Sequence, residues 1–222
     1  MITLHYLENS RAQRILWLLE ELGVEYEIKH YKRNKVTNLA PKELKKIHPL
    51  GKSPVITDGD RVVAESAVIT DYLIDNYAQG KLKPAYESND YWKYHDKMHY
   101  AEGTMMSFLI LSMLFTKIKE APVPFFIKPI VKAVANKPME SYVTPNINAN
   151  LDYLNDELAS TGWFAGNEIT GADFMMSFPL EALTKKADLS KSHPNIVKFV
   201  DNIHAMPSYI RALEKGLPYH FS

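Results

Sequence analysis

The sequence predicts a small α/β unit followed by an all-helical unit. Within the first 64 residues, apolar and polar residues alternate in several short segments, as they do in half-buried strands. Beyond residue 88 the apolar residues recur only at helical spacing. The intervening residues 80–88 contain Pro84 and show neither period, so they are predicted to be a linker. We therefore expect two units, residues 1–79 and residues 89–222.

Two strands and the helix between them form the predicted start of the α/β unit. Apolar residues alternate with polar ones over residues 2–6 and 24–28, and they recur at helical spacing over residues 12–22. Asn9 or Ser10 is available as the N-cap of this helix. Strands joined through a helix by short connections run parallel, so these segments predict a βαβ unit.

A hairpin and a closing helix complete the predicted α/β unit. Residues 55–57 and 61–64 are apolar segments separated by a turn at Asp58-Gly59, and a short helix is expected over residues 41–46. The closing helix follows, with Ser66 as its cap. The order βαβ, then ββα, is that of a thioredoxin-like domain. The chain has no cysteine, so disulfide exchange is not available to it.

Helices and proline-rich turns account for the rest of the chain. One long helix is predicted over residues 90–119, and the turn at residues 121–124 ends it. Pro129, Pro138 and Pro145 are expected to prevent one straight helix in the next region. Residues 170–173, TGAD, have the form of a capping box, so Thr170 and Asp173 are interpreted as structural. Pro179 is expected to kink the helix that follows.

Composition excludes several classes of function. The 26 basic and 26 acidic residues balance, so no overall field attracts nucleic acid. Without cysteine there is no thiol nucleophile, iron–sulfur cluster or cysteine-ligated zinc, and the eight histidines lack metal-ligand spacing. The first residues do not form a signal peptide, and the longest apolar run, residues 105–115, is shorter than the ~20 residues of a membrane span. We expect a cytoplasmic protein with neither a metal nor a membrane span.

Four motifs resemble those of cytosolic glutathione transferases, and the resemblance covers essentially the whole chain. Ser10 precedes Arg14 by four residues at the first strand-to-helix turn, as in the serine-type classes. Residues 48–55, HPLGKSPV, resemble the loop that leads to a cis-proline, and residues 64–69, AESAVI, resemble the glutamate–serine motif. Residues 170–173 match the capping box of the helical domain. The chain resembles fungal or bacterial members more than the tyrosine-type animal ones.

The resemblance implies an enzyme that uses glutathione as its co-substrate. It would conjugate the thiolate of glutathione to electrophilic, largely apolar compounds, with peroxide reduction as a side activity. Lys52 would bind the glycyl carboxylate. Ser66 and the backbone N–H groups at the helix start would bind the γ-glutamyl carboxylate, and Glu65 would contact the ammonium group. The implied glutathione-binding residues are Ser10, Lys52, Ser53, Pro54, Glu65 and Ser66. Ser53 departs from the family, which more often has an apolar residue before the proline.

The resemblance assigns catalysis to Ser10, whose hydroxyl would donate a hydrogen bond to the glutathione sulfur and favour the thiolate. From the residues alone, Ser10 and Ser66 can instead be helix caps. Tyr6 and Asn9 are the alternative contacts for the sulfur. Pro54 is cis on the family pattern, whereas an ordinary trans proline at a strand start is the structural alternative.

Further expectations concern the second substrate and the assembly. Tyr100, Met105 and Phe108 are proposed as one wall of an apolar substrate pocket, although such residues are core residues by default. The family resemblance implies a homodimer. The alternative function keeps the fold and the glutathione site in a non-catalytic ligand-binding or regulatory protein.

Overall fold

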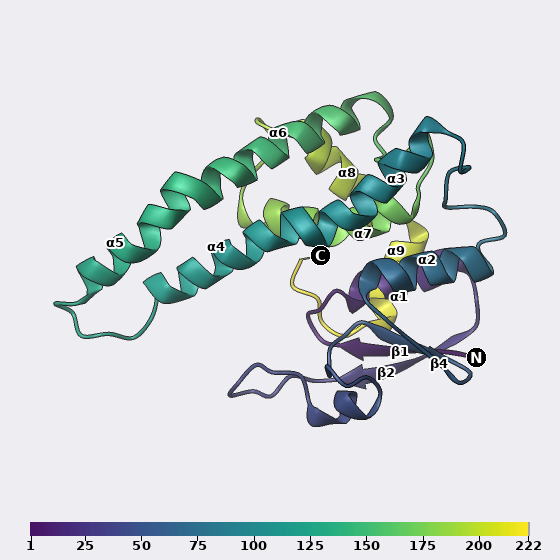
Figure 1. Ribbon diagram of the computed structural model, residues 1–222, viewed down its shortest axis with the longest axis horizontal. Helices are drawn as coiled ribbons and strands as arrows, with labels where there is room; N and C mark the ends of the chain where they lie inside the picture. Colours follow the sequence, from purple (N-terminus) through teal and green to yellow (C-terminus); the bar gives the residue numbers. More distant parts are fainter. Residues whose placement is uncertain (222) are drawn as a thin grey trace.

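The computed structural model describes residues 1–221 and places a four-stranded sheet beside a larger group of helices (Figure 1). This arrangement confirms the predicted fold class. The strands are β1 (Ile2–Leu7), β2 (Tyr26–Tyr31), β3 (Val55–Asp58) and β4 (Arg61–Ala64). The α-helices are α1 (Ala12–Leu22), α2 (Ser66–Tyr77), α3 (Asn89–Tyr100), α4 (Met106–Lys119), α5 (Lys128–Pro138), α6 (Thr144–Thr161), α7 (Gly171–Lys186), α8 (Pro194–His204) and α9 (Pro207–Lys215).

The sheet has the strand order β2-β1-β3-β4. Strands β1 and β2 are parallel, while β3 is antiparallel to both β1 and β4, so the predicted βαβ unit and hairpin are confirmed. Strand β2 begins two residues later than the alternation predicts. Ile2, the first residue of β1, pairs with Tyr26, so Val24 and Glu25 have no partner strand to pair with.

Both faces of the sheet are covered, which the alternating pattern alone does not reveal. Ile2, Leu4 and Tyr6 pack into the main core with α1 and α2. On the other face, Leu7 belongs to a small separate cluster that is closed by Leu44 of the predicted short helix, a 3₁₀ helix over Lys42–Lys46. This second cluster holds the loop after β2 against the end of β1.

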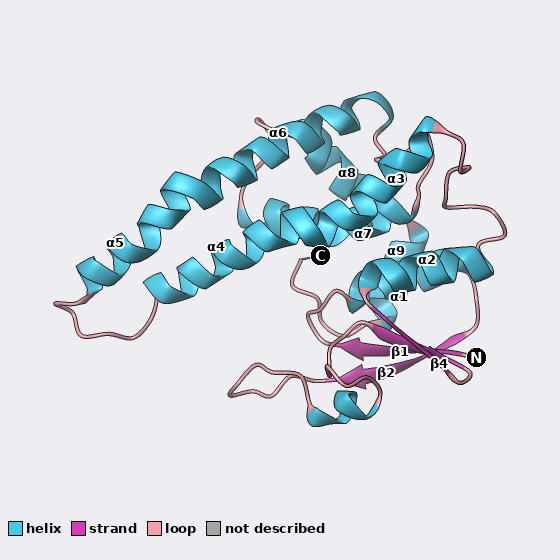
Figure 2. Cartoon of the chain, viewed as in Figure 1, coloured by secondary structure: helices cyan, strands magenta, loops and turns pink. Residues whose placement is uncertain are grey.

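Two long helical runs dominate the second half of the chain (Figure 2). The run Asn89–Lys119 comprises α3, a π-helical turn over Ala101–Met105 and α4, and it ends before residues 121–124, as predicted. The next run continues from α5 through Pro138 into α6, with a second π-helical turn over Met139–Val143 directly after the proline. Helices α4 and α5 form an antiparallel arm that projects from the body.

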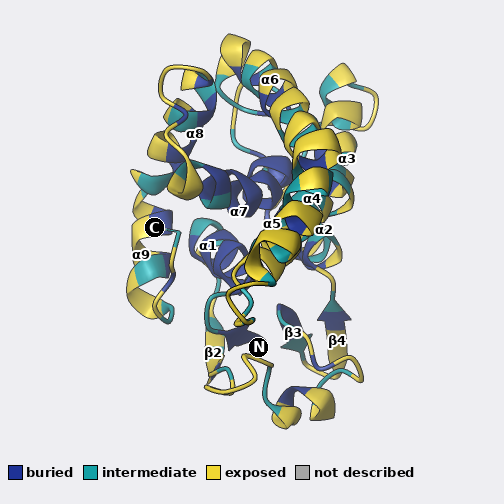
Figure 3. Cartoon of the chain, turned by 90° about the vertical axis from the view of Figure 1, so that its left-hand side faces the viewer, coloured by how far each residue is buried: buried dark blue, intermediate teal, exposed yellow. Residues whose placement is uncertain are grey.

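Helix α7 is largely buried and lies beside α1 at the centre of the molecule (Figure 3). The predicted capping box at Thr170 and Asp173 is present. The helix continues through Pro179, which has no N–H to donate to the carbonyl of Met175. Arg14 of α1 instead donates to that carbonyl, with 2.8 Å between its Nη1 and the oxygen. Pro179 therefore leaves the Met175 carbonyl available to Arg14, and this hydrogen bond links α7 to α1.

One helix of the described residues, Asn89–Lys119, has the length and hydropathy that a membrane span requires. Its first part belongs to the core, since Tyr94, Met98 and Met105 are at most 1% exposed. We conclude that this part is a core helix.

Candidate functional site

An open cleft of about 270 Å³ lies between the sheet end of the molecule and the long helix. It is lined by Arg11, His48, Leu50, Lys52, Ser53, Pro54, Ala64, Glu65, Ser66 and Glu102. Five of the six predicted glutathione-binding residues therefore border one cleft. Ser10, the sixth, does not line it.

The loop before β3 reaches the cleft through a cis peptide bond between Ser53 and Pro54, as predicted. The Ser53 hydroxyl accepts a hydrogen bond from the N–H of Leu7 at 3.1 Å and donates one to the carbonyl of His5 at 2.9 Å. These two bonds continue the β1–β3 pairing beyond its first residue, Val55. The serine that departs from the family pattern thus fixes the loop to β1.

The start of α2 forms the opposite side of the cleft. The N-cap is Glu65 rather than the predicted Ser66, and its side chain makes no capping hydrogen bond. Glu65 has φ 71° and ψ 125°, a conformation that non-glycine residues adopt at a cost of about 1–3 kcal/mol. Ser66 is 5% exposed and lies at the first helical position. The first N–H groups of a helix have no partner within it, so this start can bind an anion.

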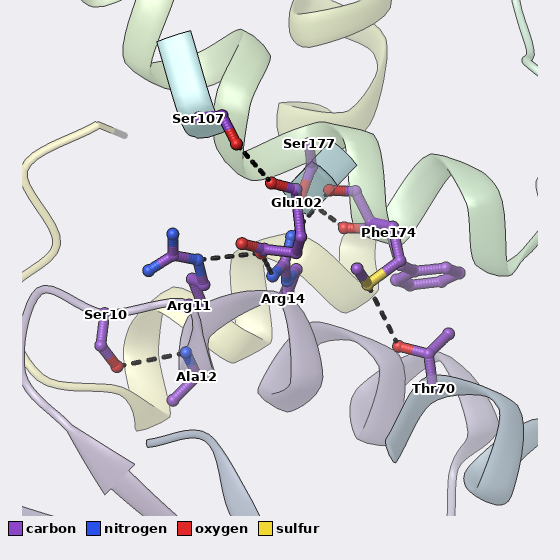
Figure 4. Close-up of polar contacts among 10 residues, drawn as sticks. Ser10, Arg11, Ala12, Arg14, Thr70, Glu102, Ser107, Phe174 and Ser177 are labelled. Atoms are coloured by element: carbon purple, nitrogen blue, oxygen red, sulfur yellow. Dashed lines mark hydrogen bonds and ion pairs between the residues drawn. The ribbon is translucent and has the colours of Figure 1, made fainter. Parts of the chain in front are cut away.

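Arg11 and Glu102, which the sequence motifs do not include, also line the cleft (Figure 4). Arg11 donates from Nε to Oε1 of Glu102 at 2.8 Å, and the buried Arg14 donates to the same oxygen. Burial acts to raise the pKa of Glu102, but the two arginines outweigh it and the pKa is lowered. Glu102 lies in the first π-helical turn, and nothing in the local sequence marks that turn.

Ser10, Tyr6 and Asn9, the three candidate contacts for the sulfur, all form hydrogen bonds within the protein. Ser10 donates to the carbonyl of Leu7 at 2.6 Å and accepts from the N–H of Ala12 at 3.2 Å, within the turn before α1. The N-cap of α1 is Arg11, not Asn9 or Ser10 as expected. Tyr6 is fully buried and donates to Gln13, and burial raises its pKa. Asn9 accepts from the N–H of His220 at 3.1 Å. None of the three candidates lines the cleft.

The proposed substrate wall is not formed as one surface. Met105 is fully buried in the core, whereas Tyr100 borders a different hollow together with Trp92 and donates to Asn150. Phe108 lies beside Tyr142, with 5.9 Å between the ring centres. The π-helical turn between positions 100 and 106 changes the helical phase, so ordinary helical spacing does not predict which residues share a face.

No group of three or more metal-ligating side chains is found within residues 1–221. The cleft instead offers cations, anions and backbone N–H groups. This donor set suits an extended, zwitterionic peptide ligand.

Comparison with known proteins identifies the family. The N-terminal domain of glutathione S-transferases matches residues 1–75, and the C-terminal domain of the same family matches residues 112–207. The chain is 33% identical to glutathione S-transferase 1 of Saccharomyces cerevisiae, covering 97% of this chain and 95% of that protein. It is 37% identical to glutathione S-transferase 3 of Schizosaccharomyces pombe, covering 97% and 88%.

A solved glutathione S-transferase from Actinobacillus pleuropneumoniae is similar in both sequence and structure. It is 35% identical over 97% of this chain and 92% of its own, with a TM-score of 0.77. The chain therefore belongs to the glutathione S-transferase family, and the resemblance inferred from its motifs is confirmed.

Proposed function

We propose that this transferase binds glutathione along the cleft and conjugates its thiolate to apolar electrophiles, with peroxide reduction as a side activity. The main observation that supports this proposal is that the Ser53–Pro54 loop and the uncapped start of α2 line the same cleft. An added peptide strand can pair with the Ser53 backbone. The N–H groups at the start of α2 can bind a carboxylate.

The two ends of glutathione match the two ends of this site. The γ-glutamyl carboxylate binds at Ser66 and the α2 start, with its ammonium group beside Glu65. The glycyl carboxylate binds Lys52, which is exposed in the loop before β3 and lines the cleft. The thiol then points toward the start of α1, where Ser10 and the positive end of the helix favour the thiolate.

Binding is tested by calorimetry with glutathione on the wild type and on the Lys52→Ala/Ser66→Ala double variant. Each change removes a contact to a carboxylate, so we expect about 10- to 100-fold weaker binding. Lys42→Ala/Ser192→Ala, two exposed residues outside the cleft, is the matched control and should bind normally. Unchanged affinity in the first double variant would place the glutathione site elsewhere.

The role of Ser10 is tested by the pH dependence of conjugation with a chlorodinitrobenzene substrate. If the hydroxyl turns from the Leu7 carbonyl to the sulfur, Ser10→Ala lowers the rate about 10- to 100-fold at neutral pH. The loss shrinks as pH passes the free thiol's pKa of about 8.5, because solution then supplies the thiolate. Tyr6→Phe and Asn9→Ala are the controls, and a loss confined to either of them refutes the Ser10 assignment.

A ligand-binding protein without useful turnover is the second candidate function. One observation favours it: the Ser10 hydroxyl is already engaged in the turn before α1. A Ser10→Ala variant with a lower melting temperature and an unchanged, pH-independent rate points to a capping role. Normal glutathione binding together with a negligible wild-type rate supports the second function.

We also propose a cytoplasmic homodimer that binds no nucleic acid and divides at a linker over residues 80–88. Exposed apolar side chains on β4, α2 and α3, namely Val62, Val68 and Trp92, offer a surface for association. The neutral chain presents no charge barrier. Sedimentation equilibrium that finds only the 25.4 kDa monomer at micromolar concentration contradicts the dimer.

A further inference from the structure

The arm formed by α4, α5 and the loop between them exposes an unusual amount of apolar surface. Within residues 1–221, eight of the nineteen exposed large apolar side chains lie in this arm, residues 106–138, about a seventh of the chain. Large exposed apolar patches mark sites of association with proteins or membranes. The arm projects away from the sheet and from the cleft, so this surface is not part of the glutathione site (Figure 1).

The tip of the arm, residues 117–132, combines two aromatic side chains with positive charge. Phe125 and Phe126 are 81% and 65% exposed, and Ile130 beside them is 63% exposed. The tip has four lysines and one glutamate, although the whole chain is neutral. None of these four lysines forms an ion pair within residues 1–221.

Three of the lysines surround one hollow at the tip. Lys119, at the end of α4, and Lys128 and Lys132, in the first turns of α5, border a hollow of about 480 Å³ with the loop between them. An anionic group such as a phosphate can be held there by several ammonium groups. Phe125 and Phe126 lie in the same loop, so apolar and cationic groups are exposed at the same end of the arm.

We propose that the tip docks on the surface of an anionic lipid bilayer. Phe125 and Phe126 insert at the boundary between headgroups and acyl chains, and the lysines contact the headgroups. The arm lies on the membrane rather than spanning it, because its two helices reverse direction within the loop 120–127. A second copy of the chain is disfavoured as the occupant, since two facing tips would bring eight lysines together.

The docking is tested by co-sedimentation of the full-length protein with vesicles. Phosphatidylcholine vesicles with about one third phosphatidylserine should bind it, pure phosphatidylcholine vesicles should bind it weakly, and salt should release it. Lys119→Gln/Lys128→Gln should weaken binding about 25-fold, at about five-fold for each lysine. Phe125→Ser/Phe126→Ser should weaken it about ten-fold or more.

Matched variants elsewhere on the surface are the controls. Lys191→Gln/Lys198→Gln removes two exposed lysines at the start of α8, and Val36→Ser/Leu39→Ser removes two exposed apolar residues from the loop after β2. Both should bind vesicles as the wild type does, and all variants should keep their circular dichroism spectra and bind glutathione normally. Equal binding to neutral and anionic vesicles, no binding to either, or equal losses in the controls would overturn the proposal. Oligomers that dissociate in the Phe125→Ser/Phe126→Ser variant, without vesicle binding, would identify the tip as a contact between copies.

Discussion

Helices α2 and α7 both begin with a hydroxyl residue near an acidic residue, but only α7 has side-chain hydrogen bonds that cap its first turn. At α7, the Asp173 carboxylate accepts hydrogen bonds from the N–H and hydroxyl of Thr170 and from the N–H of Phe164. At α2, Glu65 makes no capping bond and has a positive φ, and Ser66 faces an open cleft. The first arrangement uses its polar groups to hold the fold. The second leaves them available to a ligand.

This difference indicates which helix N-termini can bind a ligand. A start with internal partners gains little from an anion, whereas a start without them has N–H groups still to be satisfied. Backbone strain at Glu65 points the same way, because such strain clusters at functional sites. Stability and affinity should therefore separate: changes at α7 affect folding, and changes at α2 affect glutathione.

The largest expected effect is on stability, from Asp173→Ala. The change leaves two buried N–H groups without their acceptor, which should lower the free energy of unfolding by about 4 kcal/mol. Urea denaturation measures the loss, and glutathione affinity measured well below the melting temperature should stay within about two-fold. A variant that folds stably but binds glutathione poorly would break the proposed separation.

A smaller effect is expected in the pH dependence of stability. Burial raises the pKa of Asp173 from its ordinary 3.8 to about 6, against the hydrogen bonds that act to lower it. The folded state then binds this proton more tightly than the unfolded chain does, so the Asp173 contribution falls as pH rises from about 4 to about 6. Relative to Asp173→Asn, the wild type should lose about 2 kcal/mol over that window.

Denaturation of both proteins at several pH values measures this difference. The variant cancels contributions of the opposite sign from carboxylates such as Glu20 and Asp58, whose pKa values are lowered. A constant difference between pH 4 and pH 6 would show that hydrogen bonding keeps the Asp173 carboxylate ionised throughout.

The smallest effect is expected from Glu65→Gly, which should raise stability and lower glutathione affinity. Glycine adopts the positive φ without strain, so the free energy of unfolding should rise by about 1 kcal/mol. Glutathione should bind several-fold more weakly because the partner of its ammonium group is lost. Glu65→Ala separates the two causes, since it removes the charge and keeps the strain. Equal stability in the two variants would show that the backbone at position 65 is not strained.

Local patterns allowed most of the fold to be predicted, and part of the cleft. The hairpin, the capping box and the Ser53–Pro54 loop each depend on a few consecutive residues, so local sequence patterns predict them. The family motifs then place the loop and the start of α2 in one cleft. Even the missed N-cap at Glu65 is displaced by only one residue.

What the sequence could not show depends on long-range contacts or on helix phase. The Arg11–Glu102 pair joins residues 91 positions apart, and neither belongs to a motif. The π-helical turns have no recognisable residue signature, so ordinary helical spacing could not show that Tyr100, Met105 and Phe108 do not share one surface. The competing partners of the Ser10 hydroxyl are backbone groups, which every residue has and no pattern distinguishes.

The bond between Arg14 and the carbonyl of Met175 has a consequence for recombining this chain with its relatives. Because Pro179 has no N–H, this carbonyl receives no helical hydrogen bond from position 179 and Arg14 is its donor. A chimera that joins residues 1–79 to the helical half of a transferase with another residue at this position would close the helical hydrogen bond there. The buried Arg14 guanidinium would then have to share that acceptor with the new N–H. Residues 14 and 179 should therefore be exchanged together.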